Sequence, residues 1–599
     1  MKKFAPLLLL ALVVCGVYAP VFRNGFVWDD TALILRDPLI RSWRLIPEGF
    51  QHFLFTDATA SNFYRPIQRL TYTAEYAAFG FNAAPFHVTS VLCHLAAALA
   101  LLCFAREFLR ACGVEERTRN VAALIVALVW AIHPVHSSAV AYISGRADPL
   151  AATFGFSALC VGLISLRSSG ARAWALSGAG AVLFLLSALS KEAGLIFLAL
   201  WVALVVMHAT AKVRLRAVCL IPVVLVCYLS LRLPANQVPP PDSPPTPALV
   251  RPILGARAVA EYAALLVLPV TLQMERDVET HPSGFGSASI VGAARLELQT
   301  VAGLLVAAGF LYWLARERKR DRAVFLALVL SGISYLPVSG IVSLNATVAE
   351  HWLYVPSAFL LLAATITAHR FFSNTDRAKL RRIAVPALGL WVAFLGARTF
   401  VRTFDWKDQR TFLESTIASG GESARMLINL GLLEMNEDRL DLAKTHLERA
   451  LQKEPDQPFA VINLAAVALK QGDYARVREL VATAIKMPLV EARAHEMLTV
   501  LEHKETGRSN VIRMRLAART GPADWSIEKR YLKVLADTGA IDAAIAELRH
   551  CLQTQWYRAE SWHLLAELTA RTGRTVEARA ALERAALYDV RLQERGRPL

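Results

Sequence analysis

Apolar and polar residues divide the chain into two unequal parts. From the N-terminus to about residue 401, long apolar runs alternate with short polar segments, and an ordinary mixture of residues follows. A helix that spans a membrane needs about 20 mostly apolar residues. The pattern therefore predicts an all-α protein, with a polytopic transmembrane helical bundle over 1–401 and a soluble part over 402–599.

Eleven apolar runs are candidates for spanning helices. They are 4–22, 86–105, 121–134, 149–167, 173–190, 192–210, 215–232, 299–315, 322–339, 352–369 and 383–401. Met1-Lys2-Lys3 precedes the first run as in a signal peptide, but no usual cleavage site follows, so we expect an uncleaved first span. A further apolar stretch, 257–272, could form a re-entrant or interfacial helix.

Basic residues between the apolar runs predict the orientation of the bundle. Cytoplasmic loops are enriched in Lys and Arg, and all the basic loops fall on one side if the N-terminus is cytoplasmic. These loops are 106–120, 167–172, 212–216, 316–322 and 369–382. The loops 23–85 and 233–298 then face outward, the second with its Pro-rich segment 234–247. An odd number of spans also places 402–599 outside.

Composition excludes some function classes. The chain is 55% hydrophobic and 19% charged, and much of its formal net charge of +16 lies in the basic loops. Topology therefore explains the charge better than nucleic-acid binding does. The eight cysteines include no CxxC pair, which argues against a zinc site and a disulfide framework.

The soluble part repeats itself. Asn429-Leu430-Gly431 recurs 34 residues later as Asn463-Leu464-Ala465, and Gly539 recurs at the same interval as Gly573. A 34-residue period of paired helices is the tetratricopeptide pattern, and such repeats stack into a solenoid with a concave groove. The stretch 490–525 is degenerate, so we expect four to five units.

Two adjacent carboxylates follow the first predicted span. Gly25-Phe26-Val27-Trp28-Asp29-Asp30 places them in the outer loop. Carboxylates at a membrane surface are costly unless they are solvated or used. Asp29 or Asp30 could act as a general base toward a hydroxyl. The residues alone are equally compatible with a solvated Asp that caps a helix.

Other polar residues stand at the outer ends of the predicted spans. The Arg65 guanidinium suits phosphate oxygens, although such a residue also snorkels to lipid headgroups. The further residues of this kind are His133, His136, Arg146, Asp148, Lys191, Glu192, Glu350, His351 and Tyr354. Because all of them fall on one face, we predict one polar crevice for a substrate with a membrane-bound tail and a charged head.

Two of these groups have alternative interpretations. His133 and His136 could bind a metal, but Pro134 lies between them and no third ligand is evident, so hydrogen bonding or phosphate contact is favoured. Arg146 and Asp148 could instead form an ion pair that fixes their loop. A transporter would place charged residues deep inside its spans, which is not the pattern here.

Several blocks resemble the transmembrane and tetratricopeptide-repeat O-mannosyltransferases and their bacterial relatives. They are GFVWDD, YRPIQRLTY, FHVTSVLCHL, HPVHSSAVAYISGRADPLA, SKEAG and AEHWLYVPS, in the family's order between residue 22 and about 360. The repeats that follow also match. HPVHxxAVxxxxGRADxLA is the most specific block. One departure is Trp28, where the family often has His, and the repeats are fewer than in eukaryotic members.

The resemblance implies a GT-C architecture with an external active site and a polyprenyl-phosphate sugar donor. It implies that the acidic catalytic residue is Asp29 or Asp30. It also implies that the other outer polar residues lie near the donor. Family enzymes transfer mannose to Ser or Thr hydroxyls of proteins. A bacterial member would use undecaprenyl phosphate or another polyprenyl carrier.

The combined prediction is a polyprenyl-phosphate-sugar-dependent glycosyltransferase of the inner membrane, with its repeats on the periplasmic side. Its partners would be the lipid-linked sugar, membrane lipid and a protein acceptor in the repeat groove, without nucleic acid. Arg65, Arg146, Lys191 and one His would stabilise the leaving phosphate, so no cofactor or divalent metal is needed, although neither is forbidden. Two alternatives stay open: a glycolipid or polysaccharide acceptor, and a non-enzymatic repeat scaffold.

Overall fold

The structure is a computed structural model that describes residues 5–56, 62–235, 250–274, 276, 290–341, 347–373, 378–521 and 524–592. Within these ranges the regular structure is helical, and one isolated antiparallel bridge joins Arg276 to Val348. Lys2 and Lys3, and most of the predicted Pro-rich segment 234–247, lie outside the described residues. The predicted all-α class is confirmed for the part of the chain that is described.

The first part is a bundle of apolar helices. Its main helices are α1 (Ala5–Val17), α4 (Ala83–Ala111), α5 (Glu116–Ala131), α7 (Ala147–Leu166), α8 (Gly170–Ser190), α9 (Ile196–His208), α10 (Ala211–Val218), α11 (Ile221–Arg232), α12 (Arg251–Val267), α14 (Ile290–Glu317), α15 (Arg322–Tyr335), α16 (Pro356–Phe372) and α17 (Ala378–Arg402). The segment after α1 forms short turns and the helices α2 (Ile46–Gly49) and α3 (Pro66–Phe79). α6 (Ser137–Val140) lies between α5 and α7.

The predicted count of eleven spans is not supported. Within the described residues, six segments are long and apolar enough to cross a membrane: 83–111, 143–166, 170–190, 213–232, 297–317 and 379–406. A seventh would require the pair 116–131 and 134–140, which bends by 57°. Proline and tight turns account for part of the difference: Pro20 ends the first apolar run in a 3₁₀ turn, and Pro356 starts α16 well inside its run. The placement of 402–599 on the outer side of the membrane, which depended on the number of spans, therefore stays a prediction.

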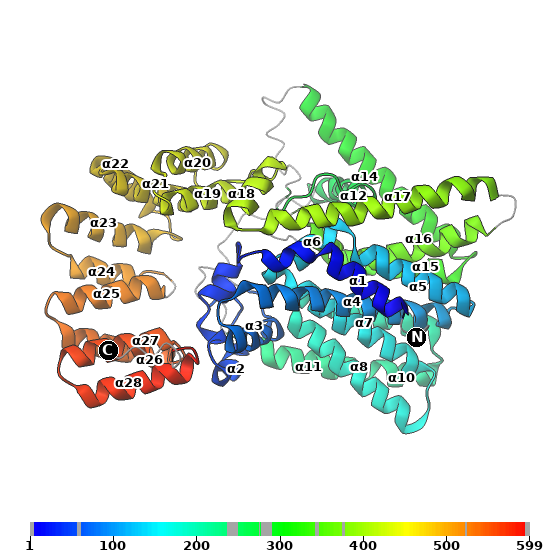
Figure 1. Cartoon of the computed structure of the whole chain (residues 1–599), viewed down its shortest axis with the longest axis horizontal. Coiled ribbons are helices and arrows are strands. Elements are labelled where there is room, and N and C mark those ends of the chain that lie inside the picture. The colour runs from blue at the N-terminus through cyan, green and yellow to red at the C-terminus, as the bar shows by residue number, and fades with distance from the viewer. Residues whose placement is uncertain are drawn as a thin grey trace.

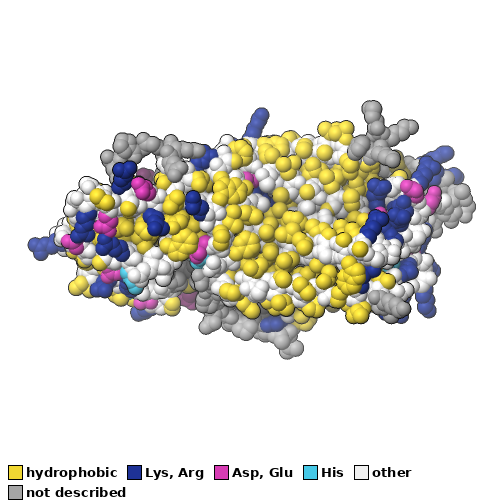
Figure 2. All heavy atoms as spheres, turned by 90° about the horizontal axis from the view of Figure 1, so that it is seen from below, with side chains coloured by type: hydrophobic (Ala, Val, Ile, Leu, Met, Phe, Trp, Pro, Cys, Tyr) yellow, Lys and Arg dark blue, Asp and Glu magenta, His cyan; other side chains and the backbone are white. Residues whose placement is uncertain are grey.

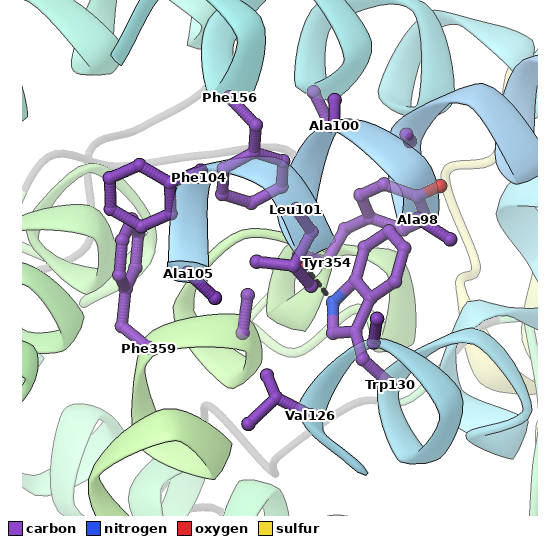
Figure 3. Close-up of a cluster of buried hydrophobic side chains, with 14 of the residues drawn as sticks. Ala98, Ala100, Leu101, Phe104, Ala105, Val126, Trp130, Phe156, Tyr354 and Phe359 are labelled. Atoms are coloured by element: carbon purple, nitrogen blue, oxygen red, sulfur yellow. Dashed lines mark hydrogen bonds between the residues drawn. The ribbon is translucent and has the colours of Figure 1, made fainter. Parts of the chain in front are cut away.

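Aromatic side chains of α4, α5, α7 and α16 interlock in the middle of the bundle (Figure 3). The Phe104 ring lies 6.0 Å from that of Phe156 and 5.7 Å from that of Phe359. The Trp130 indole N–H donates to the Tyr354 carbonyl at 2.9 Å, which satisfies a polar group in this apolar core. Close van der Waals packing and hydrogen bonds between helices drive helix association in a membrane, so this layer fixes how the four helices pack.

Small residues allow close approach of α7 and α9. Gly155 and Gly162 stand seven positions apart on α7, and a Cβ atom there would lie 2.3 Å from Phe197 and 2.6 Å from Trp201. Glycine pairs of this kind let helices pack tightly in membranes.

The surface of the bundle is apolar over a broad area (Figure 2). Elsewhere on the bundle, α14 and α17 also expose apolar side chains, which include Leu305, Leu311, Ile383 and Leu390. Soluble proteins rarely expose patches larger than a few hundred Å². Together with the candidate spans, this surface identifies a multi-pass membrane protein.

The second part is a curved array of helical hairpins (Figure 1). It begins with α18 (Gln409–Ala418), and five hairpins follow: α19 (Ala424–Asn436) with α20 (Leu440–Lys453), α21 (Pro458–Gln471) with α22 (Tyr474–Ala484), α23 (Glu491–Thr506) with α24 (Val511–Arg519), α25 (Trp525–Asp537) with α26 (Ile541–Thr554), and α27 (Ala559–Arg571) with α28 (Thr575–Tyr588). The repeated Gly539 and Gly573 turn with φ of 94° and 76°, a left-handed backbone that glycine adopts without strain. The degenerate stretch 490–525 thus still forms a hairpin.

The far end of the array returns to the segment between α1 and α4, beside α2 (Figure 1). The Tyr76 hydroxyl donates to Asp589 Oδ1 at 2.8 Å, and the Val590 N–H donates to the Arg41 carbonyl at 3.2 Å. Tyr557 is buried against Leu39 and Leu45 of the same segment. The array is therefore attached to the bundle at its C-terminal end as well as at its start.

Replacing Tyr557 with Ala should release this C-terminal attachment. Removing a buried aromatic side chain costs about 3–5 kcal/mol, so amide exchange should rise over 587–592 while residues 424–484 stay protected. Hydrogen–deuterium exchange of the full chain in detergent measures both regions. Val576→Ala, at an exposed position of α28, is the matched control, and equal exchange in both variants would refute the attachment.

Candidate active site

Asp30 links the segment that follows α1 to the block that follows α5. Its Oδ2 accepts the Val27 N–H at 3.0 Å, and its Oδ1 accepts the Ser144 N–H at 2.9 Å and the Ser144 hydroxyl at 2.5 Å. The side chain is fully buried. Burial raises the pKa of this carboxyl to about 7, although its hydrogen bonds act in the opposite direction. Both oxygens are thus occupied in holding two segments together.

Asp29 is less enclosed. Its residue is half-buried, and its backbone N–H donates to the Tyr142 hydroxyl at 3.1 Å. Burial raises the pKa of the Asp29 carboxyl, while a hydrogen bond from Tyr142 and the positive charges of Arg425 and Arg65 lower it. Of the two adjacent acidic residues, Asp29 is therefore the less buried one.

A cluster of opposite charges brings three of the predicted blocks together. Arg65 Nε lies 3.0 Å from Glu192 Oε2, and Lys191 Nζ lies 2.7 Å from both carboxylate oxygens of Asp148. His351 lies within electrostatic range of Lys191, Asp148 and Arg65, and burial is the largest cause that lowers its pKa to about 4. The cluster continues toward Asp29, because Arg65 also acts on that carboxyl.

Arg146 takes a different position from the one its sequence neighbours suggest. It is fully buried and pairs with Glu75 Oε2 at 2.6 Å, with further hydrogen bonds to Thr71 and Ser90. The possible ion pair between Arg146 and Asp148 is not formed, because Asp148 is held by Lys191. Arg146 thus joins α3 to α4 instead of facing a solvent-open site.

The predicted histidines and Tyr354 lie in the interior. His133 Nε2 is 3.1 Å from the Leu266 carbonyl, and the His136 ring lies 4.8 Å from that of Tyr354. The Tyr354 hydroxyl is 2.6 Å from His94 Nδ1. Each of these three side chains contacts other protein groups, so these contacts explain why a polar residue occurs at each position.

Glu350 lies in a second buried polar group. Its Oε1 accepts the Gln273 N–H at 2.6 Å. Burial raises the pKa of the Glu350 carboxyl, and the charge of Arg402 is the largest opposing cause. The residue therefore links the segment after α12 to the end of α17. Residues 403–408, which we call the neck, connect α17 to α18.

The neck and the first two helices of the array contribute residues near Asp29 that the sequence did not predict. The Tyr142 and Trp406 rings stack at 5.3 Å with an angle of 21°. Gln409 and Phe412 on α18, and Arg425 on α19, contact Trp28. Tyr142 lies within the HPVH block and could have been suspected, but nothing in the local sequence connects residues 406–425 with Trp28.

Comparisons with known proteins agree with this architecture. The Tetratricopeptide repeat family model matches residues 435–501. Human Protein O-mannosyl-transferase TMTC3 is 22% identical over 492 residues, which are 76% of this chain and 52% of that protein. The chain is homologous to protein O-mannosyl-transferases. Caenorhabditis elegans Protein O-mannosyl-transferase F38B6.6 is 24% identical over 434 residues, 69% of this chain and 58% of its own length.

One stretch of similarity is stronger. Mouse Protein O-mannosyl-transferase TMTC1 is 32% identical over 148 residues, which cover 24% of this chain and 15% of that protein. The chain spans about half the length of the first two curated relatives it matches. The resemblance drawn from the sequence blocks is thus confirmed, as are the tetratricopeptide repeats.

The buried state of Asp30 predicts a pH effect on stability. Its folded pKa of about 7 exceeds the ordinary value of 3.8, so its contribution to folding is complete below the ordinary pKa and is lost as pH rises through 7. The melting temperature of the wild-type chain should therefore fall more steeply between pH 5.5 and 8 than that of Asp30→Asn. If the melting temperatures of the two proteins in detergent fell equally with pH, Asp30 would not hold a proton in the folded state.

Proposed function

We propose that this protein is a membrane glycosyltransferase that moves mannose or another hexose from a polyprenyl-phosphate donor to a Ser or Thr hydroxyl of a protein. The observation that carries the proposal is that Arg65 acts electrostatically on the Asp29 carboxyl and also on Lys191, so that one charged cluster contains an acidic residue and two cations. The homologous O-mannosyl-transferases support the same chemistry. We further propose that the site and the repeats face the periplasm of a bacterial inner membrane.

The proposed reaction is a single displacement with inversion at the anomeric carbon. The acceptor oxygen forms a bond to that carbon while the bond from the carbon to the phosphate oxygen breaks. The hydroxyl proton passes to Asp29, acting as general base. The electron pair of the broken bond leaves with the polyprenyl phosphate. Asp30 keeps the loop in place, since its oxygens are already occupied by Val27 and Ser144.

Arg65 and Lys191 are suited to stabilise the charge that develops on the leaving phosphate. Both are paired with carboxylates, Glu192 and Asp148, which hold the cations in place before a donor arrives. Preorganised cations in a partly buried site stabilise a developing anion more than they would in water. In this scheme the donor site is supported by His351, Glu350 and Tyr354. The layer of side chains that packs behind it includes His133, His136 and Arg146.

The base assignment is tested by separate Asp29→Asn and Asp30→Asn variants. Loss of a general base typically lowers the rate by about 10²–10⁴-fold, so Asp29→Asn should reduce hexose transfer in membranes by that factor. Asp30→Asn should instead lower stability together with activity. Asp438→Asn, on the exposed surface of the array, is the control. Full activity of Asp29→Asn would refute the assignment.

The donor assignment predicts a selective kinetic effect. Lys191→Gln and Arg65→Gln should lower kcat/KM for the lipid-linked sugar by about 100-fold, as for loss of one preorganised charge contact, and leave the KM for an acceptor peptide nearly unchanged. Steady-state transfer assays with each substrate varied in turn measure both. Lys453→Gln, on α20, is the matched loss of a cation. An effect on the acceptor KM alone would contradict the donor role.

A further inference from the structure

Trp28, the residue before the two carboxylates, has a left-handed backbone with φ of 54°. Among the described residues, Asp438 is the other non-glycine residue with positive φ. The left-handed region costs an L-residue about 1–2 kcal/mol, and a bulky side chain stays there only when its surroundings hold it. The contacts of Trp28 therefore determine the direction of the chain as it enters Asp29.

These contacts come from the repeat part of the chain. The Trp28 N–H donates to Gln409 Oε1 at 2.6 Å. The Trp28 ring lies 5.5 Å from the Phe412 ring, and the Arg425 guanidinium stands 5.5 Å from its centroid. Gln409 and Phe412 belong to α18, and Arg425 belongs to α19, the first helix of the first hairpin.

The residues on either side of Trp28 are held in the same way. The Gly25 N–H donates to the Lys407 carbonyl at 2.8 Å, and the Asn24 side-chain amide donates to the Thr403 carbonyl at 3.0 Å. On the other side, the Asp29 N–H bonds to Tyr142, whose ring stacks on Trp406. Residues 24–28, which lead into the two acidic residues, thus rest on residues 403–412.

We propose that Gln409, Phe412 and Arg425 are positioning residues, which hold Trp28 in its left-handed conformation and so direct Asp29 toward the acceptor hydroxyl. The start of the repeat array is then a component of the active site and not only a binding surface for the acceptor. This inference rests on the proposed function, in which Asp29 is the base. An acceptor bound along the first hairpin would lie next to Asp29 without any long-range conformational change.

The kinetic test uses Gln409→Ala in the full chain. Loss of alignment should lower kcat by about tenfold or more, while the KM for an acceptor peptide changes by less than about threefold. Gln409→Glu keeps an acceptor oxygen for the Trp28 N–H and should restore most of the rate. Arg410→Ala, the neighbouring residue whose side chain pairs with Glu414 and Glu437, is the control and should stay within about twofold of the wild type. A raised KM with unchanged kcat would overturn the positioning role.

A second measurement does not depend on activity. Hydrogen–deuterium exchange over residues 24–36 should increase in Gln409→Ala and not in Arg410→Ala, with exchange over 440–484 unchanged as evidence of an intact array. Unchanged exchange over 24–36 would overturn the inference. If the wild-type chain transfers no hexose, the proposed function fails, and the exchange result decides separately whether α18 holds Trp28.

Discussion

The loop between α1 and α3 depends on one interaction, the burial of the Asp30 carboxylate between Val27 and Ser144. Two segments 114 residues apart share this side chain, so the segment after α1 and the block after α5 have one fixed position relative to each other. A buried acceptor that accepts three hydrogen bonds is costly to leave unpaired. This contact fixes the chain directly after Asp29, and the contacts of Trp28 with α18 fix it directly before Asp29.

The repeat array is joined to the same loop at two places. Its start contacts residues 24–28, and its end contacts Arg41, Ser42 and Tyr76. Repeat arrays bend easily because each unit contacts only its neighbours, but an array fixed at both ends has far less freedom. In the proposed function, the surface of the array that binds the acceptor would therefore move little relative to Asp29. The bundle and the repeats thus form one structural unit, although their compositions differ sharply.

Local patterns in the sequence were sufficient for several features. The 34-residue recurrence predicted the hairpins because each repeat packs mainly against its neighbours. The pair Asp29-Asp30 was noticed because carboxylates beside an apolar run are energetically costly unless they are solvated or have a function. The count of eleven spans was not supported, in part because hydropathy windows do not register how Pro20 and Pro356 shorten apolar runs. Partners distant in sequence were beyond reach: Arg146 pairs with Glu75 rather than with nearby Asp148, and Trp28 bonds to Gln409, 381 positions away.

The most direct test of the central claim is quantitative glycoproteomics of envelope proteins from cells that produce either the wild-type chain or Asp29→Asn at equal levels. The account predicts a hexose on Ser or Thr residues of specific proteins that disappears with Asp29→Asn, while the glycolipid profile stays the same. Identical protein glycosylation in both strains, or a change confined to glycolipids, would contradict it.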